Sequence, residues 1–197
     1  MSIGTTLLNT TATTVAASTT EIYFYKFLVT HQVFYKSKYT YALVNIKPLV
    51  PGHVLIVPLR TTVLRFGDLT PDESVDYMNT LQLIHKFIQR TYAADALNIA
   101  IQDGPESGQS VPHLHTHIIP RYSSDGYGDS IYTKLEKYDL EVLYQQFETR
   151  KKLYIESGSV NALSKKDEER SARSEEVMKK EADWLREEIE RFLEDVD

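Results

Sequence analysis

The sequence of 197 residues contains no cysteine, which excludes disulfide bonds, thiolate metal ligands and cysteine nucleophiles. It has no apolar run long enough to cross a bilayer, so we expect no membrane partner. Basic residues are outnumbered, 22 against 28 acidic ones, and the net charge is −6. Nucleic acid is therefore not an expected partner. The lack of cysteine fits a reducing compartment, and we expect the cytoplasm, with the nucleus as an additional location.

Composition changes along the chain predict four segments. Residues 1–20 carry no charge and hold eight threonines, without the basic start of a signal peptide, which predicts a disordered tail. We expect a folded domain over 21–135 and a polar, partly mobile insertion over 136–173. A C-terminal helix is predicted over 174–197, because acidic residues follow Ser174 directly and apolar residues then repeat at helical spacing.

Within 21–135 the patterns predict strands and one long helix. Strand-like segments over 39–45 and 53–58 are joined by a turn rich in proline and glycine, and further strands are predicted over 97–103 and 111–120. Residues 70–73, Thr-Pro-Asp-Glu, match a capping box and predict the helix start. An apolar stripe at helical spacing follows, made of Tyr77, Leu81, Ile84 and Ile88. With the aromatic segment before residue 37, about five antiparallel strands and a central helix indicate an α+β fold.

Half of the six histidines lie within five residues, at 113, 115 and 117. On a strand over 111–120 their side chains share one face, because successive side chains alternate between the two faces of a sheet. The residues between them then point into the core. Three imidazoles on one face are costly to bury and difficult to protonate together, so a purely structural role explains them poorly.

Two chemical uses compete for these rings. A His-x-His pair on a strand suits zinc, with Asp103, Glu106 or His53 available to complete the coordination. Alternatively one imidazole acts as a nucleophile while its neighbours orient it and bind substrate. The residue types alone leave both uses open.

The segment before the histidines favours the second use. It reads GPESGQS over 104–110, and Gly108, Gln109 and Ser110 offer backbone N–H groups, an amide and a hydroxyl. Such hydrogen-bond donors suit an anion such as phosphate. A metal ion instead requires side chains that coordinate it through lone pairs, which this segment offers less well. Glu106 is the one unsuitable residue, and we expect it to point outward.

These residues resemble a known family. The run HLHTHII over 113–119 matches the histidine-triad pattern, in which histidines alternate with apolar residues, and Thr116 is the one departure. The longer runs ALVNIKPLVPGHVLIVPLR (42–60) and QDGPESGQSVPHLHTHIIPR (102–121) resemble the fragile-histidine-triad branch of the histidine triad (HIT) superfamily, the dinucleoside triphosphate hydrolases. The resemblance spans roughly 23–135, with a weaker similarity near 173–185.

The resemblance implies a fold and a reaction. It implies a HIT-like fold and hydrolysis of a dinucleoside polyphosphate, preferably diadenosine triphosphate, to AMP and ADP. His115 would attack the α-phosphorus and form a nucleotidyl-histidine, which water then hydrolyses. His117 would contact the scissile phosphate, and His113 would orient the triad through His53.

The resemblance also implies the binding residues and the partners. The substrate-binding set would be Asn45, Gln102, Gly108, Gln109, Ser110, Val111, His117 and Lys26. No protein metal ligand is expected, and Mg²⁺ or Mn²⁺ would be held through the substrate phosphates. Relatives are homodimers, so a homodimer is expected here.

Three alternatives remain at this stage. One is a nucleoside phosphoramidase of the same superfamily, because Gln109 and Ser110 resemble that branch as well. Another is a dinucleotide sensor with slow turnover, since sensing and catalysis need the same pocket. The third is a zinc protein of unrelated fold.

Overall fold

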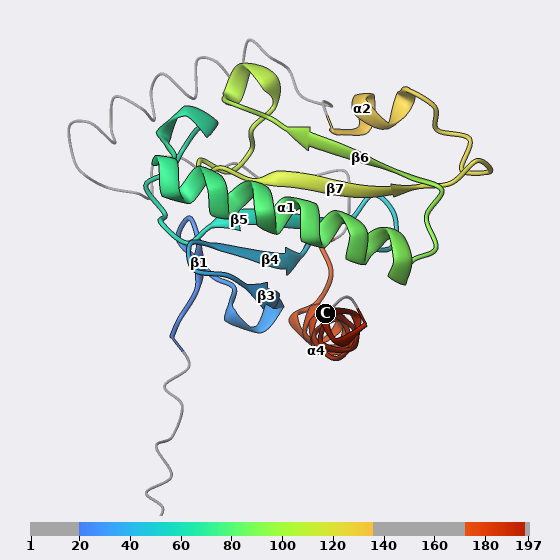
Figure 1. The fold of residues 1–197 in the computed structure, drawn as a ribbon. Coiled ribbons are helices and arrows are strands. Elements are labelled where there is room, and N and C mark those ends of the chain that lie inside the picture. Colours follow the sequence, from blue (N-terminus) through green and yellow to red (C-terminus); the bar gives the residue numbers. More distant parts are fainter. Residues whose placement is uncertain (1–19, 136–171, 196–197) are drawn as a thin grey trace, which may run out of the picture.

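The computed structural model describes residues 20–135 and 172–195 (Figure 1). Almost all of the predicted tail over 1–20 and of the predicted insertion over 136–173 therefore lies outside the described residues. None of the helices in the described ranges is both long and apolar enough to cross a bilayer.

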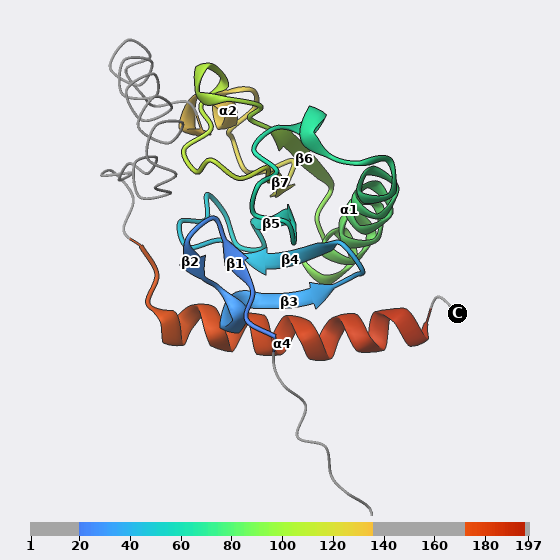
Figure 2. The same cartoon turned by 90° about the vertical axis from the view of Figure 1, so that its left-hand side faces the viewer.

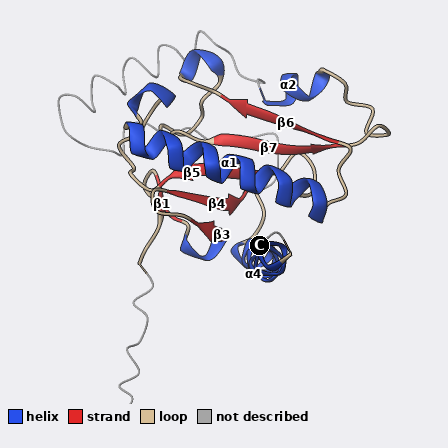
Figure 3. Cartoon of the chain, viewed as in Figure 1, coloured by secondary structure: helices blue, strands red, loops and turns tan. Residues whose placement is uncertain are grey.

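The central element is a five-stranded antiparallel sheet with the strand order β3-β4-β5-β7-β6. Its strands are β3 (Val33–Lys36), β4 (Thr40–Val44), β5 (Val54–Pro58), β7 (Thr116–Arg121) and β6 (Ala96–Ile101). A small hairpin, β1 (Tyr23–Phe24) and β2 (Phe27–Leu28), precedes them. The helices are α1 (Pro71–Thr91), α2 (Ser130–Leu135) and α4 (Glu175–Glu194), with short 3₁₀ turns η1 (Thr30–Gln32), η2 (Phe66–Asp68) and η3 (Pro105–Ser107). The expected α+β class and five-stranded antiparallel sheet are confirmed (Figure 3).

Helix α1 begins where the capping box predicted. Thr70 accepts a hydrogen bond from the Glu73 N–H, and the Glu73 carboxylate accepts one from the Thr70 N–H. Arg60 holds the same carboxylate through Nε and Nη2, at 2.8 and 2.6 Å. This guanidinium lowers the pKa of Glu73 to about 2. The helix start is thereby joined to the end of β5.

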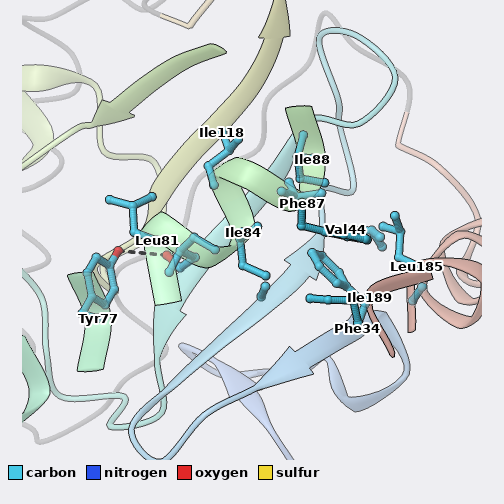
Figure 4. Close-up of a cluster of buried hydrophobic side chains, with 14 of the residues drawn as sticks. Phe34, Val44, Tyr77, Leu81, Ile84, Phe87, Ile88, Ile118, Leu185 and Ile189 are labelled. Carbon is cyan, nitrogen blue, oxygen red and sulfur yellow. Dashed lines mark hydrogen bonds between the residues drawn. The ribbon is translucent and has the colours of Figure 1, made fainter. Parts of the chain in front are cut away.

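Helices α1 and α4 cover one face of the sheet. The predicted stripe of α1 is buried in the main core, together with five residues of α4, namely Met178, Ala182, Leu185, Ile189 and Phe192. Phe34 of β3 lies where the two helices meet, with its ring 6.1 Å from that of Phe87 (Figure 4). The C-terminal helix is therefore part of the fold, packed along β3 (Figure 2).

The opposite face of the sheet carries a second apolar cluster. In β4 and β5 the residues alternate, so that Ala42 and Ile56 face the helices while Leu43 and Leu55 face the other way. This second face is where β7 brings His117, which pairs with Leu55 in the ladder. The triad therefore lies on the side of the sheet away from α1.

The last strand differs from its prediction, because β7 begins at Thr116 rather than at residue 111. Before that point the chain leaves the ladder: the Leu114 N–H donates to the Val63 carbonyl, in the loop between β5 and α1. Pro112 has no N–H to give to a neighbouring strand. His113 and His115 therefore precede the strand, and only His117 is within it.

Thr116, the departure from the apolar pattern, is buried and hydrogen-bonded. Its Oγ1 lies 2.7 Å from the hydroxyl of Tyr77, which also donates to the Ile56 carbonyl at 3.0 Å. All three groups are in the core between the sheet and α1. A polar residue is accommodated here because α1 supplies its partner.

Replacing Tyr77 with phenylalanine is expected to lower the free energy of unfolding by about 1–3 kcal/mol, because the buried Thr116 hydroxyl loses its partner. Urea unfolding measures this loss. The double variant Tyr77→Phe/Thr116→Val should regain part of it, since both polar partners are then removed. Equal stability of wild type and Tyr77→Phe would contradict the role assigned to this hydrogen bond.

Candidate active site

The three histidines gather into one buried group. The ring centroids of His115 and His117 are 5.0 Å apart. Phe24 of the β1–β2 hairpin packs against both His113 and His115, at 5.6 and 5.3 Å. Leu114, between them, is buried in the core on the helix side. The expected common face is thus formed, although only part of the segment is a regular strand.

The hydrogen bonds of His115 determine which of its nitrogens carries the proton. Its Nδ1 lies 2.8 Å from the His113 carbonyl oxygen, which can only accept. Nδ1 is therefore protonated, and in the neutral ring Nε2 keeps its lone pair. Burial lowers the pKa of His115, so the neutral form is favoured. His115 is a neutral imidazole with a nucleophilic Nε2.

His117 is held in the opposite tautomer by His53. The Leu49 N–H donates to Nδ1 of His53 at 3.1 Å, so the neutral His53 ring carries its proton on Nε2. That Nε2 lies 2.9 Å from Nδ1 of His117 and donates to it. Nε2 of neutral His117 then carries a proton and acts as a donor.

His113 has a different set of partners. Its Nδ1 accepts the N–H of Tyr25 at 3.0 Å, which places the proton on Nε2. Burial, and then the neighbouring His115, lower the pKa of His113 to about 3. The expectation that His113 acts through His53 is wrong, because the His53 ring contacts His117 and not His113. His53 directly precedes β5, and β5 pairs with β7, the strand that contains His117, whereas His113 lies in the segment before β7.

Asn45, at the end of β4, lies beside this chain of rings. Its Oδ1 accepts the Lys47 N–H at 2.9 Å, which turns Nδ2 toward His53, 3.2 Å from Nε2. Because Nε2 of His53 donates to His117, these two groups are both donors and the contact is not a strong hydrogen bond. The Asn45 amide protons are therefore suited to a ligand oxygen.

In the loop over 104–110 the glycines adopt the tight turn that was expected. The backbone N–H groups that remain available to a ligand are not all the expected ones. Gly104 and Gly108 have φ values of +117° and +89°. The Gly108 N–H donates to the Pro105 carbonyl, and the Gln109 N–H to that of Gly104. These two amides are not available to an anion, because η3 uses them. The next two N–H groups, those of Ser110 and Val111, have no acceptor in the described part of the chain.

Side chains in and beside the loop also form contacts within the protein. Gln109 donates through Nε2 to the Leu64 carbonyl at 2.7 Å, and keeps one amide proton and its Oε1. Gln102 packs under the loop, with its Nε2 close to Gly108. Lys26 lies in the hairpin turn, where its ammonium contacts the rings of Tyr25 and Phe27. Among the described residues, no contact between Lys26 and the triad is found.

The acidic residues near the loop are occupied elsewhere. Asp103 accepts the Phe66 N–H at 2.8 Å. Glu106 is exposed and pairs with Arg65 at 3.9 Å, as expected of a residue that points outward. Within 20–135 and 172–195, no group of three histidine or acidic side chains is arranged to hold a metal ion.

Three residues of the site had no signal in the sequence. Phe24 covers two of the histidines, Tyr25 donates to His113 and Leu49 donates to His53. The last two act through their backbone, so their side chains do not reveal the role. Tyr25 has φ +58°, a conformation uncommon for a bulky residue.

The buried histidines predict a loss of stability in mild acid. The pKa of His113 falls from 6.5 to about 3 on folding, so only the unfolded chain takes up a proton between these values. Stability is therefore complete above pH 6.5 and falls as the pH decreases, by about 1.4 kcal/mol per pH unit for one group. His115 adds to this in the same direction.

Urea unfolding at pH 7.5 and pH 5.5 measures the effect. Both values lie above the range in which Glu73 titrates, with a pKa lowered to about 2, so the histidines dominate the difference. The variant His113→Asn should show a smaller difference between the two pH values. Identical stability of the wild type at both would contradict a neutral, buried His113.

Comparison with known proteins agrees with this geometry. The HIT domain family matches residues 27–124. The chain is 54% identical to bis(5'-adenosyl)-triphosphatase of Saccharomyces cerevisiae, over 87% of this chain and 93% of the relative. It is 43% identical to the asymmetrical bis(5'-nucleosyl)-tetraphosphatase of Schizosaccharomyces pombe, over 84% of this chain and 93% of that relative. The structure of Plasmodium falciparum diadenosine triphosphate hydrolase in complex with cyclomarin A matches with a TM-score of 0.62 and 26% identity, over 88% of this chain and 87% of that one. This chain belongs to the HIT domain family, and within it to the fragile-histidine-triad branch.

Proposed function

We propose that this protein is a hydrolase of dinucleoside polyphosphates, with diadenosine triphosphate as its preferred substrate and AMP and ADP as products. One observation carries the mechanism: His115 presents a neutral Nε2 lone pair, while the neighbouring His117 presents a proton. A nucleophile beside a hydrogen-bond donor is what transfer of a nucleotidyl group requires. The relative that is 54% identical is named for the same triphosphatase activity.

In the first step, Nε2 of His115 bonds to the α-phosphorus. The bond from that phosphorus to the bridging oxygen breaks, and the electron pair leaves with the second nucleotide, ADP. The Nδ1–H of His115 keeps its bond to the His113 carbonyl, which stabilises the charge that develops on the ring. The Nε2–H of His117 donates to an oxygen of the reacting phosphate.

In the second step, water attacks the phosphorus of the nucleotidyl-histidine. The bond to Nε2 breaks and its electron pair returns to the ring, AMP leaves, and a proton passes to solvent. His113 takes no direct part in either step. The backbone carbonyl of His113 orients the ring of His115. The ring of His113 is in turn fixed by the Tyr25 N–H, which donates to its Nδ1.

Substrate binding is assigned to the groups around the triad. The N–H groups of Ser110 and Val111, with the Ser110 hydroxyl, face the phosphates, as does the remaining amide proton of Gln109. Asn45 donates to a ribose hydroxyl. Gln102 supports the loop from below, and Lys26 contributes a positive charge from the hairpin.

The cation is proposed to come with the substrate. The loop offers amides and a hydroxyl, and the nearby Asp103 and Glu106 are engaged with other partners. These residues fit phosphate oxygens and do not form a metal cage. Mg²⁺ or Mn²⁺ would therefore be held by the phosphates, where it neutralises part of their charge.

We also propose that the protein forms a homodimer. β6 is an edge strand of the sheet, and Ile99 on it is 43% exposed. An exposed apolar residue on an edge strand favours association with a second copy. Sedimentation equilibrium measures the mass, and a monomer at micromolar concentration would contradict the proposal.

Product analysis tests the proposed reaction. Diadenosine triphosphate with Mg²⁺ should yield AMP and ADP in equal amounts. In ¹⁸O-labelled water the label should enter AMP alone, because water attacks the nucleotidyl-histidine and not the β-phosphate. Absence of cleavage by the folded protein would remove the proposed function, and label in ADP would remove the covalent mechanism.

A panel of substrates tests the alternatives. The 43% identical relative is named for tetraphosphate cleavage, so diadenosine tetraphosphate is included. A nucleoside phosphoramidate tests for the phosphoramidase, and turnover slower than substrate dissociation would favour a sensor. A zinc protein of unrelated fold is excluded by the family membership.

A further inference from the structure

The turn over residues 45–53 carries two side chains of the site, Asn45 at its start and His53 at its end. Both are buried, and they contact each other at 3.2 Å. The turn has no regular secondary structure of its own. The direction of Asn45 and His53 therefore depends on what holds the turn in place.

The segment before α4 holds its first end. Arg173 donates from Nε to the Asn45 carbonyl oxygen at 3.1 Å, and from Nη2 to the same oxygen. The Arg173 N–H also donates to the Ile46 carbonyl, at 2.9 Å. Arg173 thus binds two successive peptide groups that lie far earlier in the sequence. Figure 1 shows this segment rising from α4 to the end of β4.

Arg173 is itself held in place by α4 and α1. Its Nη1 pairs with Oε2 of Glu181, and Oε1 of Glu181 accepts the hydroxyl of Tyr92 at 3.2 Å. The ring of Tyr92 packs edge-on against Trp184, at 5.7 Å. The side chains of Arg173 and Glu181 are 20% and 19% exposed. Each of the three guanidinium nitrogens donates one hydrogen bond.

Tyr92 holds the other end of the turn. Gly52 lies one residue before His53 with φ +78°, and a Cβ there would lie 2.8 Å from the Tyr92 ring. The ring therefore packs directly on the backbone before His53. Arg173 and Tyr92, joined through Glu181, therefore hold the two ends of the turn.

We propose that Arg173 is a positioning residue for the reaction, acting through the carbonyl of Asn45. By fixing that peptide group it directs the Asn45 side chain toward the ligand and keeps its amide against His53. This inference rests on the proposed function, in which Asn45 binds the substrate. The planar guanidinium is required, because one lysine ammonium cannot direct two N–H groups to one oxygen while a third pairs with Glu181.

Two substitutions test the proposal. Arg173→Met should raise KM for diadenosine triphosphate roughly tenfold and lower kcat to a smaller extent, because misplaced substrate contacts weaken binding first. Arg173→Lys should recover only part of the loss. The matched control is Arg186→Met, since Arg186 also joins α4 to a backbone carbonyl, that of Val33, away from the site. Arg186→Met should lower thermal stability and leave KM unchanged.

A double-mutant cycle decides whether Arg173 acts through Asn45. If it does, Arg173→Met/Asn45→Ala should have the same KM as Asn45→Ala alone. Additive effects, or equal rises of KM in the Arg173 and Arg186 variants, would overturn the proposal. If the wild type shows no hydrolysis, the proposed function fails separately. The NMR signals of the His53 and His117 ring nitrogens then decide: a shift in Arg173→Met supports positioning, and unchanged signals overturn it.

Discussion

His115→Asn is expected to abolish hydrolysis of diadenosine triphosphate, with a loss of at least about 10³-fold in kcat, while the substrate still binds. The asparagine amide can reach the position of Nδ1 and donate to the His113 carbonyl, so the shape of the site is kept. It has no counterpart to the Nε2 lone pair, so no covalent intermediate forms. Rapid quench measures the first turnover, and calorimetry measures binding.

The matched control is His85→Asn, because His85 lies on α1 away from the triad. It should leave kcat and KM unchanged. His117→Asn provides a contrast, since it removes a donor and not the nucleophile, and a slow first turnover should remain measurable. If His115→Asn retains wild-type turnover, His115 is not the nucleophile.

Gly108→Ala is expected to lower kcat/KM by about 10–100-fold and stability by about 1–2 kcal/mol. The residue has φ +89°, a conformation that costs energy for alanine. Its Cβ would lie 2.5 Å from Nε2 of Gln102, so that side chain must move. The shift occurs two residues before Ser110 and three before Val111, whose N–H groups are proposed to hold the phosphates. Steady-state kinetics and urea unfolding measure the two effects.

Substitutions at two other glycines separate the backbone strain from the steric contact with Gln102. Gly126 also has positive φ, +67°, but no atom lies within 4 Å of the position that a Cβ would take, so Gly126→Ala reports backbone strain alone. Gly67 has neither positive φ nor a close neighbour, so Gly67→Ala should be neutral. If Gly126→Ala reduces kcat/KM as much as Gly108→Ala, the effect is not specific to the loop over 104–110.

Local patterns predicted most of the fold. The capping box at 70–73 and the stripe on α1 were confirmed because each depends on residues within a few turns of one helix. The C-terminal helix was confirmed over Glu175–Glu194, but its packing along β3 was not predictable. The predicted start of the last strand, residue 111, was wrong. The periodicity of 111–120 does not reveal that the Leu114 N–H donates a hydrogen bond to the Val63 carbonyl instead of to a neighbouring strand.

The loop over 104–110 was predicted in its residue types, but its hydrogen bonds were not predicted. Two glycines and a run of donors indicated an anion site, and the glycines do adopt positive φ. The amides of Gly108 and Gln109 nevertheless bond within the loop. Such bonds depend on the turn that the backbone adopts, which residue types constrain only loosely.

The spacing of His113, His115 and His117 was enough to predict that they lie together, because a spacing of two directs alternate side chains to one side of the chain. From spacing and residue type the three rings are equivalent, and only the family resemblance selected His115. Their differences arise in the folded chain. The His113 carbonyl keeps the proton of His115 on Nδ1, the Tyr25 N–H occupies Nδ1 of His113, and His53 donates to His117. A tautomer is set by partners from distant parts of the chain, so it is a property of the folded protein.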